Sequence, residues 1–396
     1  MSPKPTPSRN TPVSREDSRR HHRRRSRLIM LRRLLVLVIV AVLAVVLWRN
    51  WDTMAPDKLL AKLQDSMQAS AGTYPVDISG THVSVLTRSE GYLFTLSDSY
   101  LTFYNTGGGE VNRFPCTYSS PLCHTAGRFV LLAEQDGKRV QLYTRTALQT
   151  ELTAKEEILA VALNADGRFA VLTRGSQSYA AQVTVYERDG TQVYTRSRSK
   201  LATAVALSPD GEHLALLSVE ANGGSLNSLV EVFPLSGSDT AAVYSHTLPD
   251  TLLYRLDYLQ NARLSAVGEA GALLINTKEN VTTPYTADTR RVLGYAANEN
   301  GVALVLREYG DTAGGTVAVV DKDGREVCTV PFTGEFRHLS TDGDSFLLLT
   351  DAAALRLDRS GADGTAAIEA DGQRAALAGD TAVVLGLNTI QAYTLE

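Results

Sequence analysis

From about Tyr74 to the C-terminus, short apolar runs alternate with turn residues. The runs are rich in Val, Leu, Ala, Tyr and Thr, and Gly, Asp and Asn separate them. This region contains no convincing long amphipathic helix, which would place apolar residues at i, i+3, i+4 and i+7. The pattern therefore predicts many short antiparallel strands joined by tight turns.

One hairpin pattern recurs in this region. Ile158–Gly167 reads ILAVALNADG, Ala202–Gly211 reads ATAVALSPDG and Val292–Gly301 reads VLGYAANENG, and a second apolar run follows each of them. Further along each unit comes a second turn, as in VYERDGTQVY or VVDKDGREVC. Such turns are typical of hairpins, because Gly accepts a positive φ and Asp or Asn bonds its local backbone. Each unit is therefore predicted to hold four strands.

The units recur at a spacing of about forty residues, which is the period of a β-propeller blade. We count eight units, which begin near Val83, Leu122, Ile158, Leu201, Leu253, Val292, Phe336 and Arg374. The last unit has room for three strands, and YPVDIS (74–79) is an unattached strand upstream of the first. If that strand pairs with the last blade, the ring closes and both edges are covered. We therefore expect an all-β propeller of eight four-stranded blades. Seven blades are the alternative, because the fifth and last units are degenerate.

The SPDG copy, flanked by two apolar strands, resembles the repeat of WD40-like and TolB-like propellers. The resemblance rests mainly on Ser208–Gly211 and Asn164–Gly167, although Trp-Asp dipeptides and Gly-His pairs are absent from the repeats. The whole layout is a tail rich in Arg and Ser at 1–27, an uncharged apolar stretch at Leu34–Trp48 and a degenerate propeller containing VALSPDG. This layout is similar to the bacterial domain-of-unknown-function family 5711. That resemblance implies an envelope protein of a Gram-positive bacterium, and it implies no reaction.

The N-terminal region differs from the repeats in charge and hydropathy. Residues 1–27 are rich in Pro, Ser and Arg and have no apolar periodicity, so we expect a disordered basic cytoplasmic tail. Leu34–Trp48 is apolar throughout, and with its flanks the segment 28–51 is long enough for one transmembrane helix. We expect a juxtamembrane linker with a short helix at 52–73 and the propeller at 74–396.

The charge distribution favours an uncleaved membrane anchor. A cleaved signal peptide is the alternative, but no small-x-small site follows the apolar run. Residues 1–33 carry about +9 and the remainder −13, within a net charge of −4. The positive-inside rule therefore places the N-terminus in the cytoplasm and the propeller outside the cell membrane. The run RRHHRRRSR has no interleaved aromatic residues, so we expect no nucleic-acid binding.

The propeller region shows no recognisable catalytic motif. It has no G-x-S-x-G elbow, no P-loop and no G-x-G-x-x-G after a strand, and both tryptophans lie beside the apolar run. DKDG at 321–324 lacks the later ligands of a calcium loop. The histidines fall in different units without i,i+2 or i,i+4 pairing: His82, His124, His213, His246 and His338. We therefore predict no catalytic residue, no cofactor and no metal site.

The three cysteines are Cys116, Cys123 and Cys328, too few for a disulfide framework. Cys116 and Cys123 would be able to pair in an oxidising compartment. The other interpretation is that both are ordinary small residues in or near the core.

Three inserts indicate a binding surface. Most units turn tightly between their second and third strands, but the third, fourth and sixth carry longer segments there. Equivalent loops of a propeller emerge on one face, so these inserts would crowd one sector of it. Loop drift without function is the other interpretation. The candidate partner-binding residues are Arg174, Gln177, Tyr179, Glu220, Asn222, Asn227, Arg307, Tyr309 and Asp311.

These patterns predict a non-enzymatic scaffold or recognition module at the cell envelope, which binds a protein or a cell-wall polymer. One alternative is a glycan-active hydrolase or lyase with its site in the central channel. Another is a single-pass envelope sensor whose basic tail reports binding outside the cell. Inward charged side chains in the channel would favour the enzyme, and an apolar or plugged channel would favour the binding module.

Overall fold

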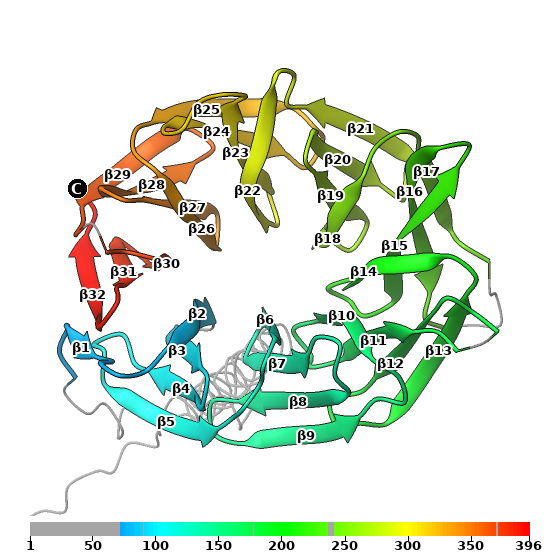
Figure 1. The fold of residues 1–396 in the computed structure, drawn as a ribbon, viewed down its shortest axis with the longest axis horizontal. Coiled ribbons are helices and arrows are strands. Elements are labelled where there is room, and N and C mark those ends of the chain that lie inside the picture. The colour runs from blue at the N-terminus through cyan, green and yellow to red at the C-terminus, as the bar shows by residue number, and fades with distance from the viewer. Residues whose placement is uncertain (1–71, 90, 177, 237–240, 370) are drawn as a thin grey trace, which may run out of the picture. The chain divides into compact units, whose positions relative to one another are not determined.

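The computed structural model describes residues 72–89, 91–176, 178–236, 241–369 and 371–396, all within the compact unit Ala69–Glu396. The described residues form eight four-stranded antiparallel sheets, which follow one another around a central axis (Figure 1). The predicted all-β propeller of eight blades is therefore confirmed, and the seven-bladed alternative is wrong.

Each blade is a meander, and its first strand lies nearest the axis (Figure 1). Blades 1 to 4 consist of β2 (Val83–Ser89), β3 (Tyr92–Ser97), β4 (Tyr100–Tyr104) and β5 (Glu110–Pro115); β6 (Pro121–Ala126), β7 (Phe129–Glu134), β8 (Arg139–Thr144) and β9 (Leu148–Thr153); β10 (Ile158–Leu163), β11 (Phe169–Arg174), β12 (Ala181–Tyr186) and β13 (Gln192–Arg198); and β14 (Leu201–Leu207), β15 (His213–Asn222), β16 (Ser225–Pro234) and β17 (Tyr244–Leu248). Blades 5 to 8 consist of β18 (Leu253–Gln260), β19 (Arg263–Gly268), β20 (Gly271–Asn276) and β21 (Val281–Thr286); β22 (Arg290–Asn298), β23 (Gly301–Glu308), β24 (Gly315–Asp321) and β25 (Glu326–Phe332); β26 (Phe336–Asp342), β27 (Ser345–Thr350), β28 (Ala353–Asp358) and β29 (Gly361–Ala367); and β30 (Arg374–Ala378), β31 (Thr381–Leu385), β32 (Thr389–Thr394) and β1 (Val76–Asp77).

The recurring hairpin turns the chain between the first and second strand of a blade. In blade 4, the Ser208 hydroxyl donates to Asp210 Oδ1 at 2.5 Å and accepts the His213 amide at 2.9 Å. Asp210 Oδ1 also accepts the Glu212 amide at 3.0 Å, and Gly211 has a φ of 68°. Asp210 therefore shapes the turn through its local backbone bonds, as the sequence predicts for this position.

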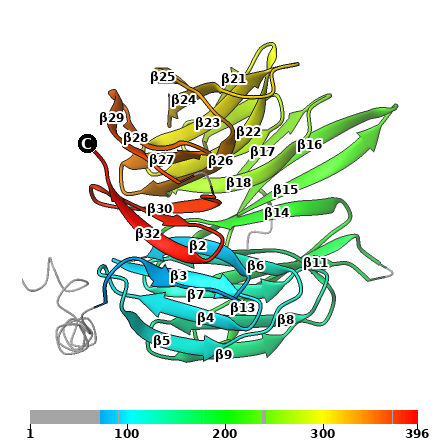
Figure 2. The same ribbon diagram turned by 60° about the vertical axis from the view of Figure 1, so that its left-hand side comes forward.

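The core lies between the blades. The second strands are mostly buried, as in Phe129–Glu134, and the third strands range from fully buried in Gly271–Asn276 to alternately buried and half-buried in Ala181–Tyr186. The fourth strands alternate between exposed and half-buried residues. Each apolar cluster contains residues of two neighbouring blades; for example, Leu217 and Val230 of blade 4 pack with Leu264 of blade 5. Each blade therefore buries its faces against its neighbours, and the closed ring leaves no terminal blade exposed (Figure 2).

The ring closes through the strand that precedes blade 1. In β1, Val76 pairs with Ile390 and Asp77 with Thr389 of β32, and the Ile78 amide donates to the Asn388 carbonyl at 2.8 Å. The prediction that YPVDIS completes the last blade is therefore confirmed. The first and last parts of the propeller share one apolar cluster around Ile78, Leu86 and Ile390.

The predicted basic tail (1–27), the transmembrane helix (28–51) and nearly all of the linker (52–73) lie outside the described residues. Within the part of the chain that the structure describes, no helix has the length and apolar character needed to cross a bilayer.

Candidate functional site

The ends of the strands define two faces of the ring. The turns between second and third strands and the links between blades lie at one end, which we call the connecting face. The turns between first and second strands and between third and fourth strands lie at the other end, the opposite face. All three predicted inserts lie on the connecting face, in blades 3, 4 and 6.

In blade 3, the insert begins at Arg174, the last residue of β11. The Arg174 guanidinium pairs with Asp136 Oδ1 at 3.0 Å and with Glu157 Oε2 at 2.7 Å, so it ties blade 3 to blade 2. The Tyr179 hydroxyl accepts a hydrogen bond from Gln182 Nε2 at 3.3 Å. Both candidate residues therefore already have partners in the same ring.

In blade 4, the predicted loop is a hairpin extension. β15 and β16 each have ten residues, and they pair without interruption as far as Asn222 and Ser225. Gly223 and Gly224 close the turn with φ values of 60° and 93°. Two successive residues with positive φ define the tight turn that suits a two-residue hairpin, and glycine adopts it without steric cost. The insert is therefore an ordered projection supported by a ladder of backbone hydrogen bonds.

The two sides of this hairpin differ in chemistry. Glu220 Oε1 pairs with Lys200 Nζ at 2.9 Å, and Asn227 Oδ1 accepts the Asp250 amide at 3.2 Å. Leu226 lies on the alternate side, two residues before Ser228. That side faces blade 5, because the Ser228 hydroxyl donates to the carbonyl of Thr251 at 2.8 Å, and Thr251 lies in the link that leads to blade 5.

In blade 6, the candidate residues of the insert differ sharply in exposure. Arg307 is only 7% exposed, and its guanidinium donates from Nε to the Gly314 carbonyl at 2.8 Å and from Nη1 to the Thr312 carbonyl at 3.2 Å. Arg307 therefore holds the loop from within and does not present its charge at the surface. Tyr309, at the start of the same loop, is 65% exposed, and Asp311 is exposed as well.

Two of the candidate residues have no described side chain. Gln177 lies outside the described residues, and Asn222 is placed by its backbone pairing with Ser225 alone.

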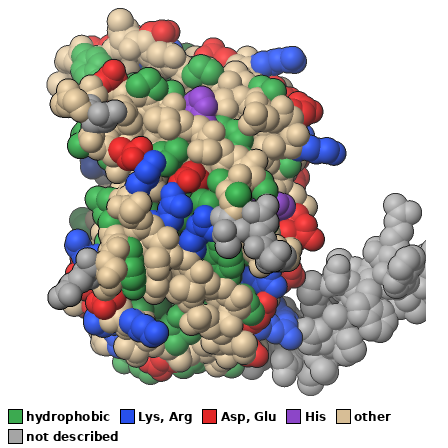
Figure 3. Space-filling model, turned by 90° about the vertical axis from the view of Figure 1, so that its right-hand side faces the viewer, with side chains coloured by type: hydrophobic (Ala, Val, Ile, Leu, Met, Phe, Trp, Pro, Cys, Tyr) green, Lys and Arg blue, Asp and Glu red, His purple; other side chains and the backbone are tan. Residues whose placement is uncertain are grey.

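Five of the large exposed hydrophobic residues on the connecting face lie in the sector of blades 4 to 6, and two others, Tyr100 and Leu387, lie on that face in blades 1 and 8. We call the first five the apolar arc: Leu201, Leu226, Leu252, Tyr254 and Tyr309, with exposed fractions from 40% to 65%. Figure 3 views the outer rim of the ring on the side of blade 4, edge-on to both faces, and there hydrophobic side chains are scattered among charges of both signs. Sequence reasoning missed Leu201, Leu252 and Tyr254, because they lie in blade links and inner strands that carry no insert.

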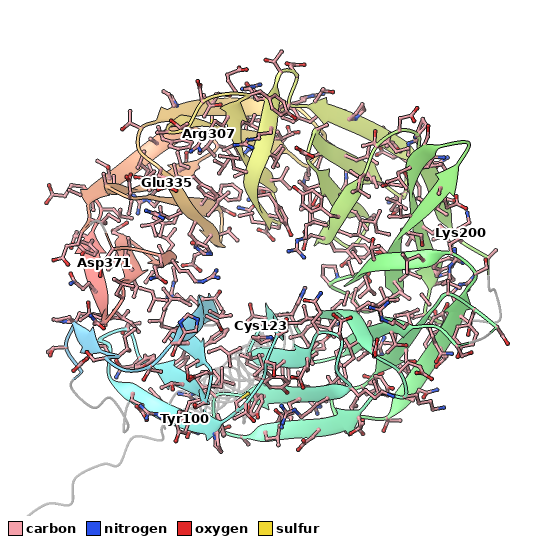
Figure 4. All side chains as sticks on the ribbon, in the orientation of Figure 1. Tyr100, Cys123, Lys200, Arg307, Glu335 and Asp371 are labelled. Atoms are coloured by element: carbon pink, nitrogen blue, oxygen red, sulfur yellow. The ribbon has the colours of Figure 1, made fainter. Side chains whose placement is uncertain are left out.

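A cavity of about 320 Å³ lies at the centre of the ring, between the inner strands of blades 2 to 5. Its polar lining includes His124 of β6 and Asp257 and Tyr258 of β18. Figure 4 shows side chains projecting toward the axis from the inner strands, with Cys123 on the channel side of blade 2 and Lys200 nearer the rim.

The surroundings of the cavity change the acidity of its titratable groups. Although the His124 side chain is exposed, the surrounding protein and, to a smaller extent, the charge of Arg255 together lower its pKa to about 4. Burial raises the pKa of Asp257, while a hydrogen bond with Tyr295 opposes that shift. Asp257 is the one carboxylate among the described residues that line the cavity.

Two other groups were candidates for chemistry. Asp210, Glu212 and His213 offer ligand atoms within 4.8 Å of one another, but Asp210 Oδ1 is already occupied by the turn. Cys116 and Cys123 are free thiols at the junction of blades 1 and 2, and burial raises their pKa values to about 11 and about 12. Both cysteines are therefore protonated at neutral pH and unreactive as nucleophiles.

Known proteins with a similar fold include BamB from Moraxella catarrhalis, with 9% identity, a TM-score of 0.48, and coverage of 81% of this chain and 99% of that chain. The Kuenenia stuttgartiensis hydrazine synthase has 14% identity and a TM-score of 0.43, with coverage of 80% and 98%. The Neurospora crassa Pan2 WD40 domain has 10% identity and a TM-score of 0.45, with coverage of 80% and 90%.

No curated protein is similar to this chain in sequence. Residues 67–367 match the model of a family of unknown function, DUF5711, as the layout of tail, apolar stretch and degenerate propeller predicts. The chain therefore belongs to the family of unknown function DUF5711.

Proposed function

We propose that this protein is a membrane-anchored, extracytoplasmic recognition module that binds a partner protein through the apolar arc. The arc is the observation that carries the proposal. Isolated exposed leucines are common on soluble proteins, but several large apolar residues on one sector of one face, rimmed by charge, are typical of interaction surfaces. Leu226 lies in blade 4, Leu252 in the link from blade 4 to blade 5, and Tyr309 in blade 6.

The chemistry of the arc favours a protein over a cell-wall polymer. Leucine and tyrosine side chains gain free energy by burying apolar surface, and tyrosine is enriched in the core of protein interfaces. Tyr254 and Tyr309 could also stack on sugar rings, but a polysaccharide would need free hydrogen-bonding groups beside them for its many hydroxyls. The charged residues beside the arc are already paired, as in Lys200 with Glu220 and Arg174 with Glu157.

The elements that carry the arc are held in place before any partner binds. The β15–β16 hairpin is paired along its whole length, and Arg307 fastens the loop that presents Tyr309. Because this surface is already ordered, binding of a partner costs little free energy for ordering it, and the affinity is higher for that reason.

The location at the cell membrane is supported by the sequence of the N-terminal region. The apolar segment at 28–51 would anchor the chain, and the basic tail at 1–27 would remain in the cytoplasm. In this arrangement, the acidic propeller would work outside the membrane, where envelope proteins are available as partners.

A paired substitution tests the proposal on the full-length protein in its native membrane. Leu226→Glu with Leu252→Glu places two charges in the arc, and we expect at least a tenfold loss of the partner recovered after crosslinking in intact cells. The matched control is Val193→Glu with Val281→Glu, because both valines are about as exposed but lie within the first two residues of fourth strands, at the opposite face.

Unchanged recovery of the partner by the arc variant would overturn the proposal. Recovery of a cell-wall polymer in place of a protein, lost in the arc variant alone, would also overturn it and would assign the face to a polymer.

A further inference from the structure

One face of the third strand in blade 3 is covered incompletely by the neighbouring blade. Along β12, buried residues alternate with half-buried ones, and the half-buried ones are Gln182, Thr184 and Tyr186. The corresponding strand of blade 5, β20, is buried at every position. Because Tyr186 packs against the apolar cluster that contains Leu142 of blade 2, the half-buried face is the one that looks toward blade 2.

A groove of about 200 Å³ lies between these two blades. Residues 153–155, at the end of β9 and in the link that follows it, form the blade 2 wall. Val171 and Ala154 contribute apolar surface, and no carboxylate belongs to the lining that the structure describes. The rest of the blade 3 wall carries polar side chains from three neighbouring strands: Thr173, Gln182, Thr184, Tyr186, Gln192 and Thr195.

The polar residues of the blade 3 wall form rows across the sheet. Thr184 of β12 pairs with Val171 on one side and with Thr195 on the other, and Gln182 pairs with Ser197. Side chains at directly opposed positions share one face of a sheet, with Cβ atoms about 4.5–5.5 Å apart. The register of the strands therefore fixes the spacing of these hydroxyl and amide groups.

Two glutamines of the wall keep part of their hydrogen-bonding capacity free. Gln182 Nε2 donates to the Tyr179 hydroxyl at 3.3 Å and to the Ser197 hydroxyl at 3.1 Å. Gln192 Nε2 donates to the Thr195 hydroxyl at 3.0 Å. No described residue bonds to the side-chain oxygen of either glutamine. The two oxygens are therefore acceptors whose amides are already held in place.

The groove also has free donors. Thr153 and Lys155 are exposed, and neither side chain forms a hydrogen bond or ion pair with a residue that the structure describes. The Thr195 hydroxyl accepts the bond from Gln192 and keeps its own proton as a donor. The groove therefore suits a ligand whose polar groups both donate and accept hydrogen bonds.

From the groove, its free donors and acceptors and its apolar surface, we propose that blades 2 and 3 bind a single sugar ring of a glycan between them. Each hydroxyl of a sugar ring both donates and accepts hydrogen bonds, which matches a wall of threonine hydroxyls and amide oxygens. The C–H surface of the ring packs against Val171 and Ala154.

The size of the groove favours a sugar ring over a peptide. Small-molecule sites usually measure about 300–1,000 Å³, and this groove is smaller, so it admits one ring. An extended peptide would need several pockets along a strand edge for its alternate side chains. None of the residues of the apolar arc lines the groove, so this proposal does not depend on partner binding at the arc.

A glycan array tests the groove with the full-length protein in detergent micelles. The array carries immobilised neutral and acidic glycans, and an array of peptides is probed in parallel. We expect saturable binding to at least one glycan, and any peptide binding should persist in the groove variants. A free monosaccharide taken from the bound glycan should compete. Sorbitol, an open-chain polyol, should not compete, because the groove receives a closed ring.

Two variants change the groove, one by removing hydroxyls and one by filling the space. Thr153→Val with Thr195→Val removes one hydroxyl from each wall and should weaken glycan binding at least tenfold. Thr184→Phe should abolish it. The matched control is Thr286→Val with Thr329→Val, which should bind like the wild type. Both control threonines are exposed; Thr286 ends β21 as Thr153 ends β9, and Thr329 is the fourth residue of β25 as Thr195 is of β13.

Thermal midpoints show which variants keep the fold, and the double threonine variant decides the test if Thr184→Phe lowers the midpoint. Four results would overturn the proposal: no glycan bound, competition by sorbitol equal to that by the monosaccharide, full glycan binding in the double threonine variant, or an equal loss in the control. The arc variants Leu226→Glu with Leu252→Glu should bind the glycan like the wild type, so failure at the groove and failure at the arc are distinguished.

Discussion

Arg88 of blade 1 forms an ion pair with Asp342 of blade 7, although blade 8 separates the two blades in the ring. Arg88 Nη1 also donates to the Leu377 carbonyl of blade 8 at 3.4 Å, so a side chain of blade 1 contacts both blade 7 and blade 8. Blade 8 is the one that the N-terminal strand β1 completes. The closure is therefore supported at the outer edge by strand pairing and near the axis by this ion pair.

A double-mutant cycle on Arg88 and Asp342 measures how much their ion pair near the axis contributes to the stability of the closed ring. We expect Arg88→Gln and Asp342→Asn each to lower the free energy of unfolding by about 1 kcal/mol, since the pair is partly shielded from water. The Arg113–Glu110 pair on β5 is the control, because both side chains are more than 40% exposed. Denaturant unfolding of all variants gives the coupling energies, and equal coupling in the two pairs would contradict this account.

A substitution at Ile390 tests how much the strand pairing of β1 with β32 contributes to the stability of the closed ring. This residue is fully buried in the cluster that joins β1 to blades 8 and 1, so Ile390→Ala should cost about 2–5 kcal/mol in the free energy of unfolding. Leu387, three residues earlier, is 62% exposed, and Leu387→Ala should cost less than about 0.5 kcal/mol. Thermal unfolding distinguishes the two, and similar midpoints would argue against closure through β32.

Alanine substitutions at two glycines in equivalent turns distinguish the cost of backbone strain from the cost of a steric clash. Gly167 and Gly343 both follow a first strand and have φ values of 88° and 55°. A Cβ on Gly167 would lie 2.8 Å from Phe129 Cζ, whereas one on Gly343 would meet nothing within 4 Å. Gly343→Ala should therefore cost about 1 kcal/mol from the backbone alone, and Gly167→Ala about 1–3 kcal/mol more. If denaturant unfolding shows equal losses, the packing of Phe129 against this turn is wrong.

The stability of the propeller should fall in acid because of His338. Burial and, to a smaller extent, the charge of Arg374 together lower the pKa of His338 to about 4, and the Ala375 amide donates to Nδ1 at 3.3 Å. In the unfolded chain this pKa is about 6.5, so the unfolded state binds the proton first as pH falls. Between about pH 6.5 and 4, the free energy of unfolding should drop by about 1 kcal/mol per pH unit from this group. His338→Gln should show a shallower pH dependence in denaturant unfolding, and an identical slope would exclude the contribution.

The fold was largely predictable from the sequence, because each hairpin leaves a local signal. The turn at Ser208–Gly211 and its relatives locate the blades, and most inner strands begin at the predicted residue; β6 and β22 begin at Pro121 and Arg290, one and two residues earlier. The blade 4 insert also carried a local signal, since Gly223–Gly224 is a hairpin dipeptide.

The candidate sites were less predictable, because they depend on contacts between blades. Arg307 is charged and lies in an insert, yet the carbonyls of its own loop enclose it. His124 and Asp257 are more than one hundred residues apart in sequence and meet at one cavity only because the ring closes. A repeat pattern identifies the blades but does not show which side chains face one another across the axis.

Photocrosslinking at Leu226 tests the central claim most directly. A photoreactive phenylalanine analogue replaces Leu226 in the full-length protein, and in a second protein it replaces Val193, which is about equally exposed at the opposite face. After irradiation of intact cells, we predict one discrete protein adduct from position 226 and none from position 193. No adduct at position 226, or the same adducts at both positions, would contradict the assignment of the apolar arc as the partner-binding surface.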